Sequence, residues 1–403
     1  MRTFHRASIA LAVAVCTTTM QVPPPAAPAV GRAVAAVAQA PRTPHVLDVS
    51  PARGLAVVEP SSVAQVLRYR MRSVRGTWAA ATGLMLLPEG EAPAGGWPFV
   101  VYNHVTTGSA DMCDPSEVTP GNSERERMTR GDDIAIRLLR AGVAVLRPDF
   151  EGIGTPGPHP YLIGRSLAAS VVAMVRAARE HEPRLGADWV VVGHSEGSVG
   201  ALFTGAADQW LPRGTRLRGV VALTPVTRMD TTLELLRRTP VAAPGVNGMV
   251  ALAGMIIGGA ATVDAPLRRL LTRGGLSDEA VALLPHLEQR CLVDLPRSDS
   301  WGGLAPSAVT GARGEEAIAR LIAVMRANDV RRLHLRPGLP VRIDAGILDA
   351  VAPLPFTEML VRDYRAAGVP ITYARWPAGH PEVVDDRFAA GPVVAWTLTR
   401  LGR

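Results

Sequence analysis

A serine lies at the centre of a short glycine-flanked motif, residues 193–197, which reads GHSEG. The pattern G-x-S-x-G is a weak signal alone, but here the strand-like run DWVVV precedes it and the helix-compatible segment GSVGALFTGAADQW begins within it. A strand, a sharp turn and a helix form a nucleophile elbow, in which the flanking glycines admit a strained serine backbone. The context therefore predicts that Ser195 is a nucleophile.

A serine nucleophile needs a general base, and the base needs an orienting carboxylate. After an elbow of this kind the chain order is serine, acid, histidine. Asp349 follows the strand-like run VRIDAG and lies in the expected turn, whereas its rival Asp344 lies inside that run. His380 follows the strand-like run ITYARW and is the one histidine after Asp349. The sequence thus predicts a triad of Ser195, Asp349 and His380.

Two N–H donors are also needed for the oxyanion that forms when a carbonyl is attacked. The first predicted donor is the backbone of Glu196, at the start of a helix whose N-terminus favours negative charge. The second is the backbone of Thr106, in the loop 103–108 after the strand-like run PFVVY, with Val105 as the alternative. The carboxylate of Glu196 would oppose an oxyanion, so we expect its side chain to point away from the site.

The elements that must position these residues alternate between short apolar runs and segments of helical period from about residue 66 onward. Runs such as VVVG and VVAL are continuously apolar, as expected for parallel strands buried on both faces. The fold class is therefore α/β, an α/β-hydrolase with a mostly parallel central sheet and helices on both faces. We predict strands at 77–88, 98–106, 142–149, 188–194, 219–225, 341–346 and 371–376, and helices at 128–141, 165–180, 197–209, 355–367 and 382–401.

One long interval, 227–336, contains helical segments with proline and glycine breaks but no good strand. We interpret it as an inserted helical cap or lid between the two parts of the hydrolase core, 45–226 and 337–403. Within it, residues 249–261 (MVALAGMIIGGAA) are apolar all round. This segment is either an ordinary buried helix or a lid helix lining an acyl-chain tunnel, with a Gly-Gly pair that permits bending or close approach.

The first 40 residues are interpreted as a signal peptide followed by a lead-in rich in proline and alanine. Arg2 and Arg6 precede a short apolar run at 7–16, and small residues offer cleavage after Ala27 or Ala40. The run is too short to span a bilayer, so no transmembrane segment is predicted. We therefore expect a secreted protein.

Composition excludes several classes of function. The chain contains no lysine, which rules out a lysine base or Schiff base. The net charge is +7, but the arginines are scattered among acids and no nucleic-acid motif accompanies them, so we predict no nucleic-acid binding. Zinc-site spacing is absent, and no metal or cofactor is implied.

Beyond the leader, the two cysteines, Cys113 and Cys291, suggest one disulfide in an exported protein, with two buried free thiols as the alternative.

Together these motifs resemble a known family, the secretory lipases typified by Candida antarctica lipase A. The resemblance implies a lipase or esterase with a helical cap after the sixth strand and a disulfide matching Cys113 and Cys291. It extends from about residue 66 to the C-terminus and includes the surroundings of Asp349 and His380. It rests on four blocks: 104–116 (HVTTG through DMCDPS), 149–157 (DFEGIGTPG), 158–166 (PHPYLIGRS) and the elbow.

Two residues depart from the family pattern. Val105 stands where bacterial relatives usually have the glycine of HGTTG, which would alter the oxyanion loop, and Ser198 stands where a second glycine commonly follows the elbow. Asp149 and Glu151 could be mistaken for a catalytic carboxylate pair. We interpret them as structural residues that satisfy loop backbone in the turn-rich stretch 152–157.

The predicted function is hydrolysis of carboxylic esters through a Ser-Asp-His triad and an acyl-enzyme. The export signal and the apolar insertion favour a lipase acting on medium or long acyl glycerides. Its expected partners are a small-molecule lipid or ester substrate and a lipid–water interface. The alternatives are a short-chain carboxylesterase, another acyl hydrolase or transferase such as a peptidase or thioesterase, and a non-catalytic lipid-binding protein.

Overall fold

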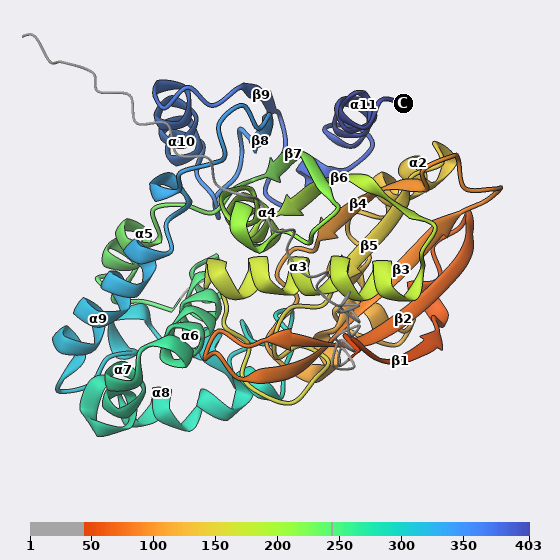
Figure 1. Ribbon diagram of the computed structural model, residues 1–403. Coiled ribbons are helices and arrows are strands. Elements are labelled where there is room, and N and C mark those ends of the chain that lie inside the picture. Colours follow the sequence, from red (N-terminus) through yellow and green to blue (C-terminus); the bar gives the residue numbers. More distant parts are fainter. Residues whose placement is uncertain (1–43, 243–244) are drawn as a thin grey trace, which may run out of the picture. The chain divides into compact units, whose positions relative to one another are not determined.

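A nine-stranded sheet runs through the centre of the protein (Figure 1). The computed structural model describes residues 44–242 and 245–403. The predicted signal peptide, 1–40, lies outside the described residues. The strands are β1 (Val46–Pro51), β2 (Ser61–Arg72), β3 (Trp78–Pro88), β4 (Trp97–Asn103), β5 (Ala144–Pro148), β6 (Leu185–His194), β7 (Arg216–Leu223), β8 (Val341–Gly346) and β9 (Ile371–Trp376).

The spatial order of the strands is β1-β2-β3-β5-β4-β6-β7-β8-β9. The pairs from β5 to β9 are parallel, whereas β1, β2 and β3 pair antiparallel and β3 joins β5 antiparallel. The predicted α/β-hydrolase fold is confirmed, and each predicted strand is present. β1 and β2 were not predicted, because these antiparallel strands are only half-buried and lack the continuous apolar run of a parallel strand.

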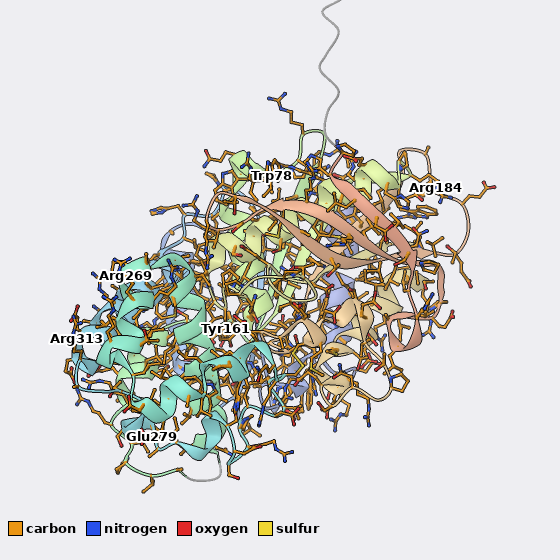
Figure 2. The ribbon with its side chains drawn as sticks, turned by 90° about the horizontal axis from the view of Figure 1, so that it is seen from below. Trp78, Tyr161, Arg184, Arg269, Glu279 and Arg313 are labelled. Atoms are coloured by element: carbon orange, nitrogen blue, oxygen red, sulfur yellow. A yellow bond between two sulfur atoms is a disulfide. The ribbon has the colours of Figure 1, made fainter. Side chains whose placement is uncertain are left out.

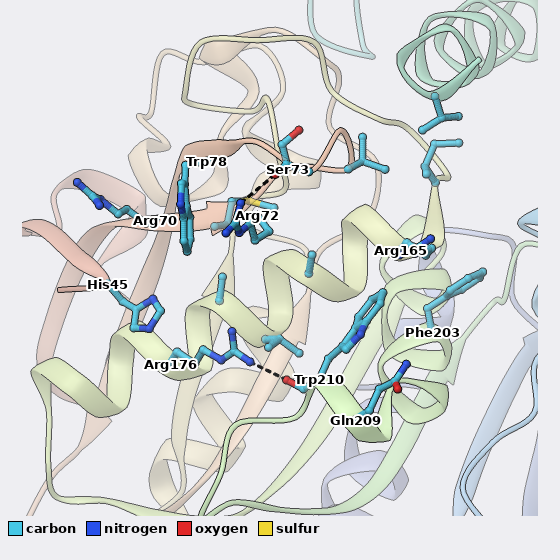
Figure 3. A pocket seen from close by; sticks show the side chains of 18 of the residues that line it. His45, Arg70, Arg72, Ser73, Trp78, Arg165, Arg176, Phe203, Gln209 and Trp210 are labelled. Atoms are coloured by element: carbon cyan, nitrogen blue, oxygen red, sulfur yellow. Dashed lines mark hydrogen bonds between the residues drawn. The ribbon is translucent and has the colours of Figure 1, made fainter. Parts of the chain in front are cut away.

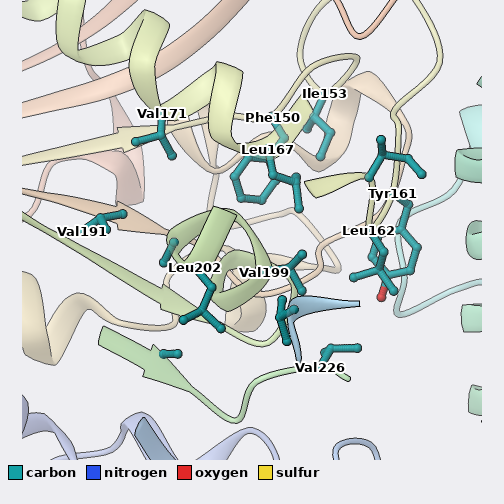
Figure 4. Close-up of a cluster of buried hydrophobic side chains, with 14 of the residues drawn as sticks. Phe150, Ile153, Tyr161, Leu162, Leu167, Val171, Val191, Val199, Leu202 and Val226 are labelled. Atoms are coloured by element: carbon teal, nitrogen blue, oxygen red, sulfur yellow. The ribbon is translucent and has the colours of Figure 1, made fainter. Parts of the chain in front are cut away.

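Helices cover both faces of the sheet. One face carries α3 (Gly164–His181), α4 (Glu196–Ala206) and α10 (Leu354–Ala366), and the other carries α2 (Asp132–Arg140) and α11 (Ala390–Leu401). Beneath α3 and α4, aliphatic side chains fill the space above β6 (Figure 4): Leu167, Val171, Val199, Leu202 and Val191. Parallel strands thus lie between two apolar layers.

Two predicted helices have different bounds for local reasons. The helix predicted from 128 to 141 begins only at Asp132, as α2; Met128 ends a separate short helix, α1 (Arg125–Met128), and Gly131, whose φ is 101°, lies between the two. A Cβ there would lie 2.1 Å from the hydroxyl oxygen of Tyr102, so only glycine fits. The last helix begins at Ala390 rather than 382, because a short 3-10 turn, Glu382–Val384, and a loop precede it.

Between β7 and β8 the described residues form helices and no strand. These are α5 (Met229–Leu236), α6 (Val246–Val263), α7 (Ala265–Leu270), α8 (Asp278–Ala282) and α9 (Gly314–Ala327), with short 3-10 and π turns between them. We call residues 227–336 the cap segment; its helices gather beside the sheet, where Figure 2 labels Arg269, Glu279 and Arg313.

The long apolar segment predicted around 249–261 lies within α6. By length and composition alone, α6 could cross a membrane, with a mean hydropathy of 1.7. However, 61% of it is buried inside the protein, as in a core helix of a soluble protein. One side of α6 packs in the core through residues such as Val250 and Met255, and the other lines a cavity through residues such as Leu252.

Candidate active site

Ser195 lies in a strained turn between the end of β6 and the start of α4. Its φ is 55° and its ψ is −113°, a conformation that non-glycine residues rarely adopt. The flanking glycines permit the turn: a Cβ on Gly193 would lie 2.0 Å from the carbonyl oxygen of Gly197, and a Cβ on Gly197 would lie 2.2 Å from that of Asn103. The geometry is that of a nucleophile elbow, with Ser195 among the residues that line a cavity.

The structure brings Ser195, His380 and Asp349 together. The distance from Nε2 of His380 to Oγ of Ser195 is 2.7 Å, and Nδ1 of His380 lies 2.7 Å from Oδ2 of Asp349. The other carboxylate oxygen of Asp349 accepts hydrogen bonds from the backbone N–H groups of Val351 and Ala352. Asp349 is therefore held rigidly by its own turn, and it holds the imidazole in the orientation that a general base requires.

A second histidine fixes the backbone of His380. Nε2 of the buried His194 lies 3.0 Å from the carbonyl oxygen of His380. Burial lowers the pKa of His194 well below its ordinary value, so the ring is neutral and its Nε2–H donates to this carbonyl. His194 was not singled out from the sequence, because nothing in the elbow motif specifies its partner.

Asp344, the rival acid, is engaged elsewhere. Arg342 donates to both of its carboxylate oxygens at 2.7 Å, and the indole N–H of Trp376 donates at 2.9 Å. This pairing compensates the buried charge within β8 and β9 and leaves Asp349 as the carboxylate that contacts His380.

The loop that carries the second predicted oxyanion donor, 103–108, begins at the last residue of β4. Both Val105 and Thr106 line the cavity that Ser195 opens into. The side-chain oxygen of the buried Thr106 lies 3.1 Å from the hydroxyl of Tyr161. The N–H of Glu196 belongs to the first turn of α4, where helix N–H groups have no partner within the helix. Of the two residues predicted to supply donors, Glu196 thus follows Ser195 directly in the chain, and Thr106 lines the same cavity as Ser195.

The side chain of Glu196 is buried and lies outside the lining of this cavity. Its Oε1 lies 2.8 Å from Nε2 of His159, and both side chains are fully buried. Burial alone would lower the pKa of His159, but the charge of Glu196 and the hydrogen bonds to Glu196 and Glu151 outweigh it and raise the pKa. The carboxylate thus forms a buried ion pair beneath the elbow.

One segment, 158–163, therefore supports both predicted oxyanion residues, through His159 on Glu196 and Tyr161 on Thr106. The segment belongs to a block that carries the family resemblance, but the sequence predicts no role for its residues. Local spacing could not reveal that role, because the contacts connect positions far apart in the chain.

A disulfide joins Cys113 to Cys291, with the Cα atoms 5.5 Å apart. Beside it, the N–H of Leu292 donates to the carbonyl of Thr107, and Gly108 forms a bridge with Cys291. A Cβ on Gly108 would lie 2.7 Å from the sulfur of Cys113. The cap segment is thus fastened directly to the end of the oxyanion loop.

Asp149 and Glu151 have structural partners, but not the ones that the sequence suggested. Asp149 accepts from the N–H and the hydroxyl of Ser116, and Glu151 accepts from the N–H of Val74 and the hydroxyl of Ser166. The prediction that they satisfy backbone within 152–157 is wrong, because both side chains turn toward segments that tertiary folding brings near.

The cavity at the elbow has a volume of about 450 Å³. Ser195 and His380 open into it from the core, while α5 and α6 of the cap segment provide an apolar wall: Met229, Leu233, Leu236, Met249, Leu252, Ala253 and Ile256. An apolar cavity with a few convergent polar groups is typical of a site for a small organic substrate. Among the described residues, no group of three His, Cys, Asp or Glu side chains could hold a metal ion.

Comparison with known families agrees with this geometry. Residues 126–402 match the model of the secretory lipases. The chain belongs to the secretory lipase family. As a member of this family it is an ester hydrolase, which confirms the resemblance and the enzyme class predicted from the sequence. A search of curated proteins finds no match.

Solved structures of other hydrolases share the fold of this secretory lipase. Lipase A of Candida antarctica in its closed state superposes with a TM-score of 0.69 at 17% identity, covering 89% of this chain and 82% of that one. The rice cell wall degrading esterase LipA of Xanthomonas oryzae gives 0.64 at 17% identity, covering 87% and 96%. A putative hydrolase of Legionella pneumophila gives 0.65 at 16% identity, covering 88% and 98%.

Proposed function

We propose that this secretory lipase hydrolyses carboxylic esters of medium or long acyl chains, with Ser195, His380 and Asp349 as its catalytic triad. The observation that carries the proposal is the continuous hydrogen-bonded chain from Ser195 through His380 to Asp349. Oγ of Ser195 attacks the ester carbonyl while Nε2 of His380 takes its proton. His380 then protonates the leaving alcohol, and water releases the acid from the acyl-enzyme.

The N–H groups of Glu196 and Thr106 would stabilise the negative oxygen in both steps. Asp349 favours the imidazolium that forms, because its carboxylate lies 2.7 Å from Nδ1. Val105 replaces a glycine of the family pattern, yet its side chain is accommodated in the cavity lining. We therefore expect the oxyanion loop to work with this substitution.

The preference for longer acyl chains is supported by the cap segment. The cavity wall on α5 and α6 is apolar, and a smaller cavity of about 40 Å³ continues from it between α5, α6 and α9. Three residues line both: Leu233, Leu236 and Ala253. An acyl tail longer than a few carbons would follow this path and bury apolar surface at about 25 cal/mol per Å².

Exposed apolar side chains lie close in sequence to residues that line the cavity. Leu235 is 66% exposed beside the lining residue Leu236, and Leu348 is 71% exposed two residues before Ala350. Such side chains favour adsorption to a lipid–water interface. We place the enzyme outside the cytoplasm, in keeping with its family and with the predicted signal peptide.

The test is hydrolysis of p-nitrophenyl esters from acetyl to palmitoyl by the wild type, Ser195→Ala and Ala253→Phe. We expect Ser195→Ala to lose on the order of 10⁴-fold or more in kcat. Ala253→Phe should lose activity on palmitoyl but retain it on butyryl, since the added ring closes the junction between the cavities. Activity confined to acetyl and butyryl esters in the wild type would indicate a short-chain esterase, and turnover that survives Ser195→Ala would refute the triad.

A further inference from the structure

A second, larger cavity lies on the face of the sheet that α3 covers. Its volume is about 770 Å³, and it shares no lining residue with the cavity at Ser195 (Figure 3). Its floor is one face of α3, with three small apolar residues between two arginines: Arg165, Ala169, Val172, Ala173 and Arg176. This spacing of four, three, one and three residues places all five on one side of a helix.

The two walls of this groove lie on opposite sides of α3 (Figure 3). The end of β2, with Arg70 and Arg72, and the start of β3, with Trp78, provide one wall together with the turn between them. Phe203 of α4 and the neighbouring Trp210 provide the other. The groove is therefore a channel with tryptophans on both sides and a small-residue floor.

The charge of the groove is positive and uncompensated. No Asp or Glu is among its described lining residues, and none of its four arginines forms an ion pair with a described carboxylate. Elsewhere arginines of this chain pair closely, as Arg216 does with Asp188. Arg165 also lies in the first turn of α3, where the helix dipole disfavours a cation. Folding alone gives no reason for this concentration of charge.

The guanidinium groups are held in place rather than loose. Arg72 stacks over the ring of Trp78 at 4.1 Å, and Arg165 stacks over the ring of Trp210 at 5.2 Å. Arg176 donates to the carbonyl of Trp210 at 3.0 Å. One N–H of Arg72 donates to the carbonyl of Gly76, and stacking leaves the other N–H groups of Arg72 and Arg165 able to donate to carboxylate or sulfate oxygens.

The shape of the groove selects among anionic ligands. Arg165 and Arg176 are eleven residues apart on α3, which corresponds to about 16 Å along the helix axis. A flat lipid surface would not reach a floor that lies between two walls. A linear chain would fit, if it carried negative groups at intervals and presented flat faces to the tryptophans. Sugar rings with carboxylate or sulfate groups meet these requirements.

We infer that this groove binds an acidic polysaccharide chain and anchors the enzyme to it, apart from the ester site. The binding would rest on Arg165 and Arg176 at the two ends of the floor, with Arg72 and Trp78 on one wall. Because the groove and the ester cavity share no residue, the inference does not depend on the proposed catalytic residues.

The test is calorimetric titration of the purified protein with hexagalacturonate and with dextran sulfate, at about 0.15 M salt to suppress non-specific attraction. Neutral dextran and single-stranded DNA of similar length are the comparison ligands. We expect Arg165→Gln and Arg176→Gln each to weaken binding roughly tenfold, because each removes a charge-assisted contact. Trp78→Ala should weaken binding while leaving the net charge unchanged.

The matched control is Arg400→Gln, because Arg400 stacks over Trp396 in the same way but lies far from the groove in α11. This variant should bind within about twofold of the wild type. Hydrolysis of p-nitrophenyl butyrate by all variants should remain at the wild-type level, which reports that the fold is intact.

Tighter binding of hexagalacturonate assigns the site to carboxylates, and tighter binding of dextran sulfate assigns it to sulfates. Equal loss in Arg400→Gln, tighter binding of DNA, or unchanged binding in the groove variants would overturn the inference.

Discussion

The buried pair of His159 and Glu196 beneath the elbow gives a prediction whose magnitude follows from the structure. Replacing His159 by Leu fills a similar volume but leaves the carboxylate of Glu196 without its one hydrogen-bond partner, since Oε2 has none among the described residues. Breaking a buried ion pair from one side costs about 3–5 kcal/mol. The carbonyl of Glu151 also loses the 2.8 Å contact with Nδ1 of His159, which adds about 1 kcal/mol.

The assay is equilibrium urea unfolding with the disulfide intact. We expect His159→Leu to lower the free energy of unfolding by about 4–6 kcal/mol, a large part of the 5–15 kcal/mol typical of a protein domain. The double variant His159→Leu/Glu196→Gln should recover about half of this loss, because a buried amide is less costly than a buried charge. A loss below about 1 kcal/mol in His159→Leu, or no recovery in the double variant, would refute the buried ion pair.

The same pair predicts a pH dependence. The pKa of His159 is raised in the folded state above its ordinary value of about 6.5, despite burial, by Glu196. The stabilisation is therefore fully present below about pH 6.5 and is lost as the pH rises through the raised pKa. The stability difference between the wild type and Glu196→Gln should shrink as the pH rises above about 6.5. A difference that stays constant or grows would contradict a protonated His159.

Three further predictions concern the supports of the site. Tyr161→Phe removes the hydroxyl beside Thr106 and should lower kcat on p-nitrophenyl butyrate roughly tenfold with little change in KM. Gly259→Ala would place a Cβ 2.4 Å from the backbone of Tyr161 and should cost about 1–3 kcal/mol in urea unfolding, whereas Gly391→Ala meets nothing within 4 Å and should cost nothing. Reducing the Cys113–Cys291 disulfide should cost roughly 5 kcal/mol, given its separation of 178 residues.

The parts of the fold that follow local patterns could be predicted from the sequence. The buried parallel strands form continuous apolar runs, and the elbow places a strand, a turn and a helix in succession, so β6, Ser195 and α4 were predicted together. The same reasoning placed Asp349 and His380 after β8 and β9. Each of these predictions depends on residues that are close together in the chain, and a single sequence is therefore enough to make it.

The residues that support the site could not be predicted in this way. His159 contacts Glu196 across 37 positions, and His194 contacts the backbone of His380 across 186. Neither contact produces a motif of characteristic spacing that could be recognised in the sequence. Asp149 and Glu151 were recognised as structural, but their partners were wrong because the prediction considered only the nearest loop. β1 was missed because an edge strand that is half-exposed has no continuous apolar run.

Residues of the cap segment and of the core line one cavity together. The cap segment provides the apolar wall of the ester cavity through α5 and α6, and it is fastened to the oxyanion loop by the disulfide and by the N–H of Leu292. Gly259 of α6 lies against the backbone of Tyr161, whose hydroxyl contacts Thr106. A displacement of α6 would therefore be transmitted to the predicted oxyanion donors. Under the proposed role of Thr106 as an oxyanion donor, we expect substrate contacts in the cap segment to change the rate of the chemical step as well as affinity, because Gly259 lies against the residue that contacts Thr106.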